Sequence, residues 1–344
     1  MTRVSNSNDC IDAVITWVDS NDIEWQKEKK KYKPVIENEE SDNIARFRDW
    51  DNLNLLVRSI EMNMPWINHI FIVTNGQIPK WYKKNDKVKL VFHKDFIPKE
   101  YLPTFSSHTI ELNLHRIKEL SEKFIYFNDD TFVINKTNPT DFFANNRPCD
   151  AAVLNIHCVK KSLMIYQISN NDVAIINDHF EIKKVLKENP LSWFNIKYGL
   201  KNNLQNILLS NCPRFSGFKQ LHLAQSFLKT TFEEVWEKEY KELDRVCKCK
   251  FRQEDGINQW IMKEWQICSN NFKPVKIKHR GILIDFEKNE EKEELLLCKK
   301  IIENSKYKLI CINDGDKIKD FETIKSVVNK ELEKKFPNKS ICEK

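Results

Sequence analysis

Short apolar runs recur along the first part of the chain, and each of them ends in polar residues. The runs lie at 11–19, 70–74, 88–92 and 124–127. A short apolar run bounded by turn or polar residues is typical of a buried strand. The pattern therefore predicts four strands in this part of the chain.

Apolar residues at helical spacing separate these runs and predict helices. One such stretch is 53–62, which Pro65 ends, and another is 109–120. The charged stretch 27–43 predicts a further helix that leads into a loop. The order strand, helix, strand, strand, helix, strand is typical of an α/β sheet with parallel members.

The remainder of the chain has a different pattern. Residues 151–280 are rich in Lys and in helical periodicity, with helices predicted at 232–240 and 255–265. A last short strand is expected at 309–312, and an amphipathic helix is expected at 321–336. The middle of the chain is therefore predicted to be mainly helical.

Polar residues stand at the carboxyl ends of the predicted strands. Asp19 follows the first strand, Asn75 follows the second, and Asn128-Asp129-Asp130 follow the fourth. In open α/β sheets ligands gather beyond the carboxyl ends of the strands. We therefore expect these residues to meet in one pocket, although they are distant in sequence.

The acidic pair Asp129 and Asp130 offers oxygen ligands of the kind that magnesium prefers, alone or with Asp19. The alternative for such a pair is a solvated turn or a helix N-cap, and for a lone pair this alternative is favoured. A second pair, Asn313-Asp314, follows the strand at 309–312. Its presence reduces the preference for a solvated turn or N-cap over a metal site.

The charge and composition exclude several classes of protein. The 344 residues carry 56 basic and 50 acidic side chains, a net charge of +6. This mild excess fits phosphorylated ligands or anionic lipid and does not indicate nucleic-acid binding. The chain has no G-x-x-x-x-G-K, no G-x-G-x-x-G and no G-x-S-x-G, which argues against a P-loop nucleotidase, an NAD-dependent dehydrogenase and a serine hydrolase.

The cysteines and the apolar runs indicate a cytoplasmic protein. The ten Cys are scattered, and the Cys247/Cys249 pair is weak evidence for a metal, so reduced and mostly buried thiols are expected. There is no apolar run of about 18 residues that would predict a membrane span. The polar N-terminus lacks the apolar stretch of a signal peptide.

Two further residues are candidates for chemistry, although each also has a structural interpretation. His222 lies among apolar residues, where a histidine is usually part of the core, but it is also a candidate general base. Arg252 is expected to open a helix, and its guanidinium is suited to bind a phosphate.

Taken in order, several segments resemble the Stealth family. These are hexose-1-phosphate transferases of microbial capsule and exopolysaccharide synthesis, related to the animal phosphotransferase that tags lysosomal enzymes. The matching segments are ITWVDSND, RFRDWDNLNLLVRSIE, PWINHIFIVTNGQIPKW, LPTFSSHTIELNLHRIKELSEKFIYFNDDTF, HLAQSFLKTTFEEVWE, FRQEDGINQW, CINDGD and FPNKSICEK.

The resemblance implies one catalytic domain over residues 1–344 with a Rossmann-like, GT-A-like sheet flanked by helices. Residues 1–150 would bind the nucleotide-sugar, 151–280 would form a helix-rich part with His222 and Arg252, and 281–344 would complete the site. It also implies a UDP-hexose donor, a polysaccharide or lipid-linked oligosaccharide acceptor, and a Mg²⁺ or Mn²⁺ ion.

Carried over to this chain, the resemblance implies three catalytic residues, Asp130, His222 and Arg252, with Asp129 and Asp130 as metal ligands. The residues that we expect to bind the donor are Trp17, Asp19, Asp22, Arg46, Asn75, Gly76, Asn128, Asn313 and Asp314.

The expected reaction transfers hexose-1-phosphate to a sugar hydroxyl and releases UMP. A glycosyltransferase that releases UDP is the alternative, and a catalytically silent polysaccharide-binding protein is a third hypothesis. The expected location is the cytoplasm, with a peripheral contact at the inner face of the plasma membrane. For the Lys-rich helix at 321–336, contact with anionic lipid is weighed against a solvated face, which is favoured. Substrate specificity is expected in loops at 27–43 and 183–216.

Overall fold

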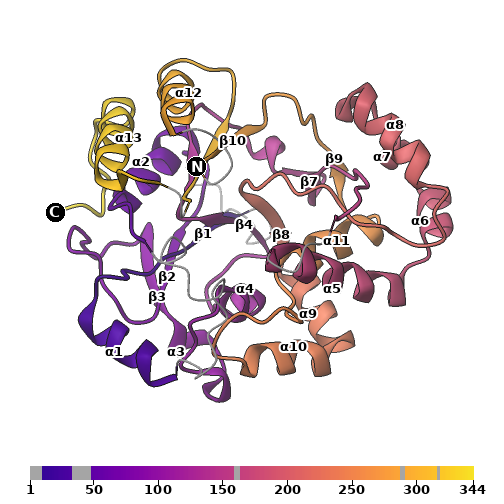
Figure 1. Ribbon diagram of the computed structural model, residues 1–344, viewed down its shortest axis with the longest axis horizontal. Coiled ribbons are helices and arrows are strands. Elements are labelled where there is room, and N and C mark those ends of the chain that lie inside the picture. Colours follow the sequence, from indigo (N-terminus) through magenta and orange to yellow (C-terminus); the bar gives the residue numbers. More distant parts are fainter. Residues whose placement is uncertain (1–9, 33–47, 159–162, 287–290, 316–317) are drawn as a thin grey trace, which may run out of the picture.

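A five-stranded sheet lies at the centre of the computed structural model, which describes residues 10–32, 48–158, 163–286, 291–315 and 318–344 (Figure 1). The strand order is β3-β2-β1-β4-β8. The first four are parallel, and β8 runs antiparallel to β4. The strands span β1 (Ile11–Thr16), β2 (Ile70–Thr74), β3 (Val88–Phe92), β4 (Lys123–Asn128) and β8 (Gln225–Leu228). This confirms the four predicted strands and the parallel α/β sheet, and adds β8.

The apolar runs form strands because both faces of this sheet are covered. Along β1, Val14 packs into one hydrophobic cluster, whereas Ala13 and Ile15 pack into the other. The same alternation holds for β4, where Phe124 and Tyr126 face one cluster and Ile125 and Phe127 face the other. A strand buried on both faces has an almost continuous apolar sequence, which is why these runs were easy to recognise.

A second sheet joins the carboxyl-terminal part of the chain to the end of β4. Its order is β10-β11-β5, with β10 (Gly281–Asp285) parallel to β11 (Leu309–Asn313) and β11 antiparallel to β5 (Thr131–Val133). A third, small sheet contains β6 (Phe143–Ala144), β7 (Arg147–Asp150) and β9 (Lys273–Pro274). Since β5 begins directly after Asp130, the second sheet places β11 beside the carboxyl end of β4.

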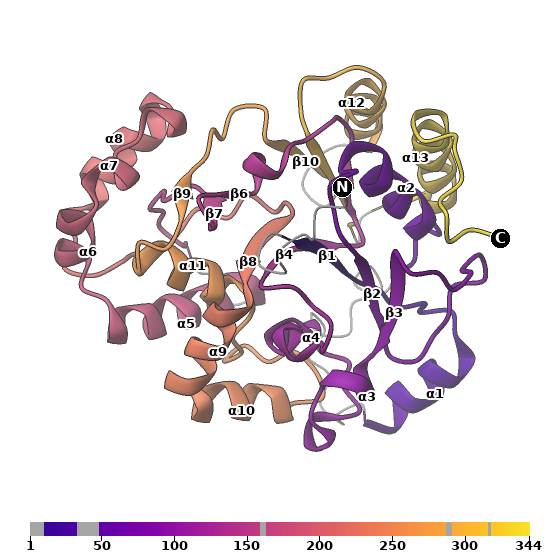
Figure 2. The same ribbon diagram turned by 180° about the vertical axis from the view of Figure 1, so that it is seen from behind.

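Helices surround these sheets in two groups and an arm. One group packs α2, α12 and α13 on one side, and the other contains α4, α5, α9, α10 and α11, while α6, α7 and α8 form an arm at the periphery (Figures 1 and 2). The α-helices are α1 (Ile23–Tyr32), α2 (Leu53–Asn63), α3 (His93–Phe96), α4 (Ser107–Leu112), α5 (Met164–His179), α6 (Ile182–Glu188), α7 (Pro190–Trp193), α8 (Leu200–Leu209), α9 (Lys229–Lys238), α10 (Tyr240–Lys248), α11 (Trp260–Cys268), α12 (Glu291–Glu303) and α13 (Phe321–Lys335). The 3₁₀ helices are η3 (Lys99–Tyr101), η4 (Leu114–Arg116), η5 (Pro139–Asp141) and η6 (Ile196–Tyr198). The predicted helices at 53–62 and 321–336 and the helix-rich middle are confirmed, and within the described ranges no helix is both long and apolar enough to cross a membrane.

The helix predicted at 109–120 is wrong in its length. The structure has α4, which ends at Leu112, and then the short η4. Asn113 interrupts the helix because its side-chain Nδ2 donates to the carbonyl of Thr109 at 2.8 Å. An Asn side chain that competes for the backbone in this way ends a helix.

The helix predicted at 255–265 begins only at Trp260, and Arg252 therefore lies in a loop rather than at a helix start. The loop is held from outside, because Asn171 donates to the carbonyls of Glu254 and Gly256. A Cβ on Gly256 would lie 2.8 Å from the carbonyl oxygen of Gln253, so this turn requires glycine.

Two other expectations also differ from the structure. The predicted helix at 232–240 is divided between α9 and α10. The stretch 183–216, expected as a loop, contains most of α6, together with α7 and α8. Part of the stretch 27–43 lies outside the described residues. The cysteines are free thiols, most of them buried, as expected, although Cys158 is exposed.

Two carboxyl groups, Asp172 of α5 and Glu264 of α11, are completely buried where these helices pack. Asp172 accepts from the Asn258 amide at 3.2 Å, and Glu264 accepts from Gln220 at 2.9 Å. Burial raises the pKa of Glu264 to about 8, and burial together with the charge of Glu264 raises the pKa of Asp172. Folding therefore takes up protons at neutral pH.

We predict that Glu264→Gln makes stability less dependent on pH. In the wild type the free energy of unfolding falls as pH rises from the ordinary pKa of glutamate toward about 8, because the folded state binds a proton that the unfolded state has released. Without this carboxyl the decline between pH 5 and 8 should shrink by about 3 kcal/mol, measured by urea unfolding. The exposed Glu234→Gln is the control, and parallel pH profiles for both variants would contradict the prediction.

Candidate active site

The carboxyl ends of three neighbouring strands lie level with one another. Thr16 of β1 pairs with Asn128 of β4 on one side and with Val73 of β2 on the other. The segments that follow these strands, 17–19, 75–77 and 128–130, therefore leave the sheet at one edge. The strand register thus places these polar residues at one edge of the sheet, while their meeting in a single pocket stays a prediction.

Two hydrogen bonds of the Gln77 side chain connect the loop after β1 to the loop after β2. Its Nε2 donates to the carbonyl of Asp19 and its Oε1 accepts from the Asp19 amide, both at 2.8 Å. Gly76 has a φ of 119°, which favours glycine and forms the tight turn before Gln77. The side-chain oxygen of Asn75 is buried and has no hydrogen-bond partner in the described structure, so it is available to a ligand.

An open cleft of about 700 Å³ lies between this turn and α1. Its lining is Asp22, Glu24, Trp25, Lys27, Glu28, Lys30, Lys31, Asn75, Gly76 and Gln77. Asp22 begins α1, since its Oδ1 accepts from the amides of Glu24 and Trp25, and the bond from Trp25 is the main reason for its lowered pKa. The cleft brings together the predicted Asp22, Asn75 and Gly76 but does not include Asp130 or His222, so it accounts for only part of the site.

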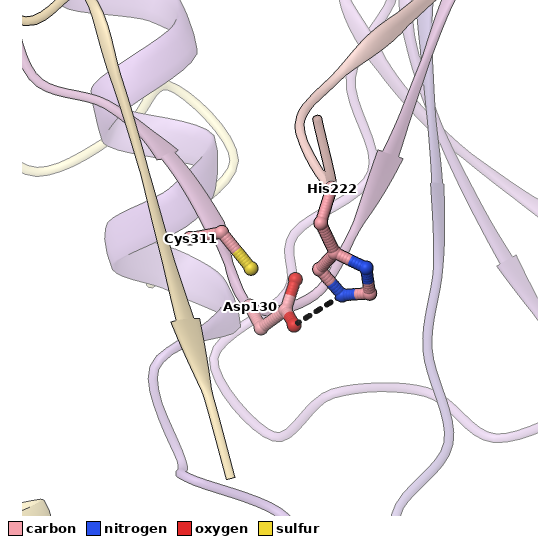
Figure 3. Close-up of side chains that lie close together, drawn as sticks. All are labelled: Asp130, His222 and Cys311. Atoms are coloured by element: carbon pink, nitrogen blue, oxygen red, sulfur yellow. Dashed lines mark ion pairs between the residues drawn. The ribbon is translucent and has the colours of Figure 1, made fainter. Parts of the chain in front are cut away.

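Asp130, His222 and Cys311 converge from three different segments (Figure 3). One ligand-type atom from each lies within 4.8 Å of the other two. The Oδ2 of Asp130 is 3.9 Å from Nε2 of His222, and its Oδ1 accepts from the Thr131 hydroxyl at 2.9 Å. Burial and the neighbouring Asp130 raise the pKa of the Cys311 thiol well above its usual range, so the thiol stays protonated.

The second sheet creates this convergence. Cys311 pairs with Thr131 in the β5–β11 ladder, and the Ile312 amide donates to the carbonyl of Asp130 at 2.9 Å. His222 has a φ of 49°, in the left-handed region that histidine tolerates better than most residues. Its side chain is 38% exposed, so His222 is not the enclosed core histidine of the structural interpretation.

A second carboxylate group surrounds Asp129. Burial against the protein, then the charges of Asp130 and Asp49, raise the pKa of Asp129 to about 8. Asp129 also reaches water, and solvent screening makes the shift smaller than full burial would. Burial raises the pKa of Asp49 to about 6, although Asp49 accepts from Nε1 of Trp17 at 3.2 Å. No Lys or Arg of the described residues forms an ion pair with Asp129 or Asp49.

This group of carboxylates fits a hard divalent cation. Mg²⁺ and Mn²⁺ prefer carboxylate oxygens and water, and because the pKa values of Asp129 and Asp49 are raised, a bound cation would favour their ionised forms. Asp129 and Asp130 are the residues that would hold such an ion, with Asp49 beside Asp129. The thiol of Cys311 is a softer ligand and does not belong to this set.

Arg252 is positioned by a polar network that reaches β1. Its Nη2 donates to Ser107, at the first residue of α4. Glu111, one turn further along, lies close enough to Arg252 for the guanidinium to lower its pKa against the larger raising effect of burial. The Tyr126 hydroxyl donates to Glu111 at 3.1 Å and lies 3.0 Å from the Thr16 hydroxyl. This network fixes the guanidinium although Arg252 lies in a loop.

The remaining predicted donor residues have differing environments. Trp17 is almost buried, with its indole nitrogen turned to Asp49. Asn128 ends β4 half-buried, and Asn313 donates to Asp285 at 3.1 Å. Asp314 forms a two-bond ion pair with Arg48, so its oxygens already have a partner. Arg46 lies outside the described residues.

The sequence interpretation missed Asp49, Gln77, Tyr126 and Cys311. Two of them had a signal: Cys311 lies two residues before Asn313, so both side chains point to one face of β11, and Tyr126 has the same relation to Asn128 on β4. Gln77 and Asp49 stand in polar loops, where the pattern does not distinguish a ligand from a solvated residue.

Two family models match the amino-terminal part of this chain. The family model described as Stealth protein CR1, conserved region 1, matches residues 11–34, and that described as Stealth protein CR2, conserved region 2, matches residues 46–150. These regions contain the loops after β1, β2 and β4, but neither His222 nor Arg252.

Three curated bacterial proteins are similar to almost the whole chain. The capsular polysaccharide phosphotransferase WcwK of Streptococcus pneumoniae is 39% identical, with 97% of this chain and 98% of the relative covered. The receptor polysaccharide phosphotransferase WefC of Streptococcus oralis is 33% identical, with 97% and 99% covered. The exopolysaccharide phosphotransferase cps2G of Lactiplantibacillus plantarum is 33% identical, with 97% and 96% covered.

Among solved structures, the apo structure of the bifunctional glycosyltransferase WbbM aligns with 98% of this chain and 51% of its own. The identity is 13% and the TM-score is 0.41. This likeness is too weak to support a fold assignment, and the α/β fold follows from the strand order and register alone.

We predict that Ser107→Ala weakens the binding of UDP by about tenfold, because the loss of a hydrogen bond to a charged group releases the Arg252 side chain. The measurement is isothermal titration with UDP. Ser269→Ala is the control, since its hydroxyl donates only to the carbonyl of Gln266 at the far end of α11. Equal affinities of the two variants for UDP would show that Arg252 does not bind the phosphates.

Proposed function

The chain belongs to the Stealth protein family, and on this basis, together with the geometry of the site, we propose that it transfers hexose-1-phosphate from a UDP-hexose to a sugar hydroxyl. The product is a phosphodiester in a capsular or other cell-surface polysaccharide, and the leaving group is UMP. The printed names of the relatives support the class of reaction, phosphotransfer in polysaccharide synthesis.

The contact between His222 and Asp130 indicates which residues take part in the proposed reaction. His222 presents an exposed imidazole beside Asp130, whose second oxygen is held by Thr131. A carboxylate in this position stabilises the imidazolium that forms when histidine accepts a proton. One oxygen of Asp130 is already engaged by the Thr131 hydroxyl. We therefore assign the base to His222 and the stabilising charge to Asp130.

The reaction begins when the acceptor hydroxyl loses its proton to His222. Its oxygen forms a bond to the phosphorus that carries the hexose, and the bond from this phosphorus to the bridging oxygen of UMP breaks. UMP leaves with the electron pair of that bond. His222 then returns its proton to solvent.

Positive charge at the phosphates comes from two sources in this proposal. Arg252, held by Ser107, binds phosphoryl oxygens, for which the planar guanidinium is well suited. A Mg²⁺ or Mn²⁺ ion, when bound to Asp129 and Asp130, supplies further charge that compensates the diphosphate. The uridine and ribose then occupy the cleft beside α1, where Asn75 offers an unpaired oxygen and three lysines line the wall.

The alternative within the enzymes is a glycosyltransferase that attacks the anomeric carbon and releases UDP. The names of the relatives favour phosphotransfer over this alternative. A silent polysaccharide-binding protein is disfavoured, because His222, Asp130 and Arg252 are all present. We further propose that the protein acts in the cytoplasm on a polysaccharide or lipid-linked acceptor, with a peripheral contact at the membrane.

We predict that incubation with a UDP-hexose and an acceptor releases UMP. Phosphorus NMR distinguishes UMP from UDP and detects the new phosphodiester directly. A panel of UDP-sugars identifies the hexose. Release of UDP, with no phosphodiester signal, would overturn phosphotransfer and favour the glycosyltransferase.

We predict that Asp130→Asn and His222→Gln each lower kcat by about 10² to 10⁴, the usual contribution of a positioned acid or base. The double variant should be little slower than either single variant, because the two residues act as a unit. Asp178→Asn, at an exposed position of α5, is the control. Wild-type activity in Asp130→Asn, with the fold intact by circular dichroism, would show that the centre lies elsewhere.

A further inference from the structure

Helix α8 lies at the outer edge of the arm that α6, α7 and α8 form (Figures 1 and 2). Four of its five apolar residues face outward, whereas Leu209 packs against the core. Leu200, Leu204, Ile207 and Leu208 are each between 51% and 78% exposed. Spacings of four, seven and eight residues place them on one stripe of a helix. A stripe of this kind normally faces the core.

Apart from Leu209, the inward contacts of α8 are made by polar side chains. Asn206 is completely buried, and its side chain accepts from the Leu154 amide and donates to the carbonyls of Ala152 and Trp193. Gln205 donates to the carbonyl of Leu154 at 2.7 Å. These bonds hold the helix in one rotation, so the outward direction of the leucines is fixed by the fold.

Two residues of the neighbouring turns extend the apolar surface along the arm. Leu191 of α7 is 80% exposed, and Ile196 of η6 is 94% exposed. Asn203 of α8 donates to the carbonyl of Asn195, which keeps η6 against α8. Exposed apolar surface gathered on one element marks an interaction site.

Beyond α6, which carries Glu188, the part of the arm that contains α7, η6 and α8 has only basic charges. From 189 to 232 the chain has no Asp or Glu, whereas Lys197, Lys201 and Arg214 lie in this stretch. A second stretch without acidic residues, 265–284, contacts the arm where Lys197 donates to the carbonyl of Pro274. It adds the exposed Lys276 and Lys278.

We propose that the outward face of α8, with Leu191 and Ile196, docks on the surface of a membrane that contains anionic lipid. Leucine and isoleucine enter the boundary between headgroups and acyl chains, and the surrounding lysines bind the anionic headgroups. A second copy of this chain fits less well, because a two-fold contact places the same patch against itself, and the lysines would then meet cations without an acidic partner.

This inference rests on the membrane contact in the proposed function and gives it a location, α8. It is tested without catalysis, so the two can fail separately. A protein that releases UMP but ignores vesicles overturns only the docking surface. A protein that binds vesicles but releases UDP overturns only the phosphotransfer.

The test is sedimentation of the full chain with vesicles of phosphatidylcholine containing about one third phosphatidylglycerol. The wild type is expected to bind these vesicles, and to bind pure phosphatidylcholine and high-salt samples much less. The double variant Leu204→Gln/Leu208→Gln should lower the partition coefficient by about tenfold or more. Lys201→Glu should lower it as well, while the circular dichroism spectrum stays unchanged in both.

The matched control is Leu296→Gln on α12, an exposed leucine outside the arm that is 68% accessible. It should bind vesicles as the wild type does. Failure of the wild type to bind, or an equal effect of the control and the double variant, overturns the proposal. The proposal is also overturned if the wild type does not bind vesicles but forms a dimer in analytical ultracentrifugation, and the double variant is a monomer.

Discussion

The pairing of β5 with β11 is the contact on which the site depends. β4 ends at Asn128 and β5 begins at Thr131, so Asp129 and Asp130 are held between two sheets. The backbone of Asp130 is tied to β11 through the Ile312 amide. On β10, a Cβ at Gly281 would lie 2.5 Å from a methyl group of Leu223. Glycine here lets Leu223 pack closely and so fixes the backbone next to His222. One small sheet therefore positions both members of the Asp130–His222 pair.

This arrangement brings carboxyl groups close together, which makes their ionisation unfavourable. Asp49 and the adjacent pair Asp129 and Asp130 come from two segments that lie close together. Burial raises the pKa of Asp49 and Asp129, and the charges of Asp130 and Asp49 raise that of Asp129 further. A fold without a ligand would gain stability from a lysine or arginine in this place. Carboxyl groups with raised pKa values that lie together in this way are typical of metal-dependent or acid-base chemistry. The crowded carboxylates thus favour an active centre over a solvated turn.

The sequence allowed the sheet, its parallel order and the meeting of its polar strand ends to be predicted, because strands buried on both faces leave continuous apolar runs. It also allowed α2 and α13 to be predicted from their periodicity. The interruption of α4 at Asn113 could not be predicted, since it depends on a side-chain bond to the backbone. The contact of Cys311 with Asp130 depends on the pairing of β5 and β11, which are separated by about half of the chain, and no local pattern predicts such a pairing.

Helices α8 and α13 show why an amphipathic pattern does not by itself identify a surface. In α13 the apolar residues Ile324, Val328 and Leu332 are buried, so the Lys-rich side that remains is a solvated face, as the sequence interpretation favoured. In α8 the same kind of stripe faces outward, because Asn206 satisfies three backbone groups on the inward side. Turning α8 about its axis would leave these groups without partners, and an unpaired buried polar group costs about 1–3 kcal/mol. The hydrogen bonds of one asparagine therefore determine which helix presents both apolar and cationic residues to its surroundings.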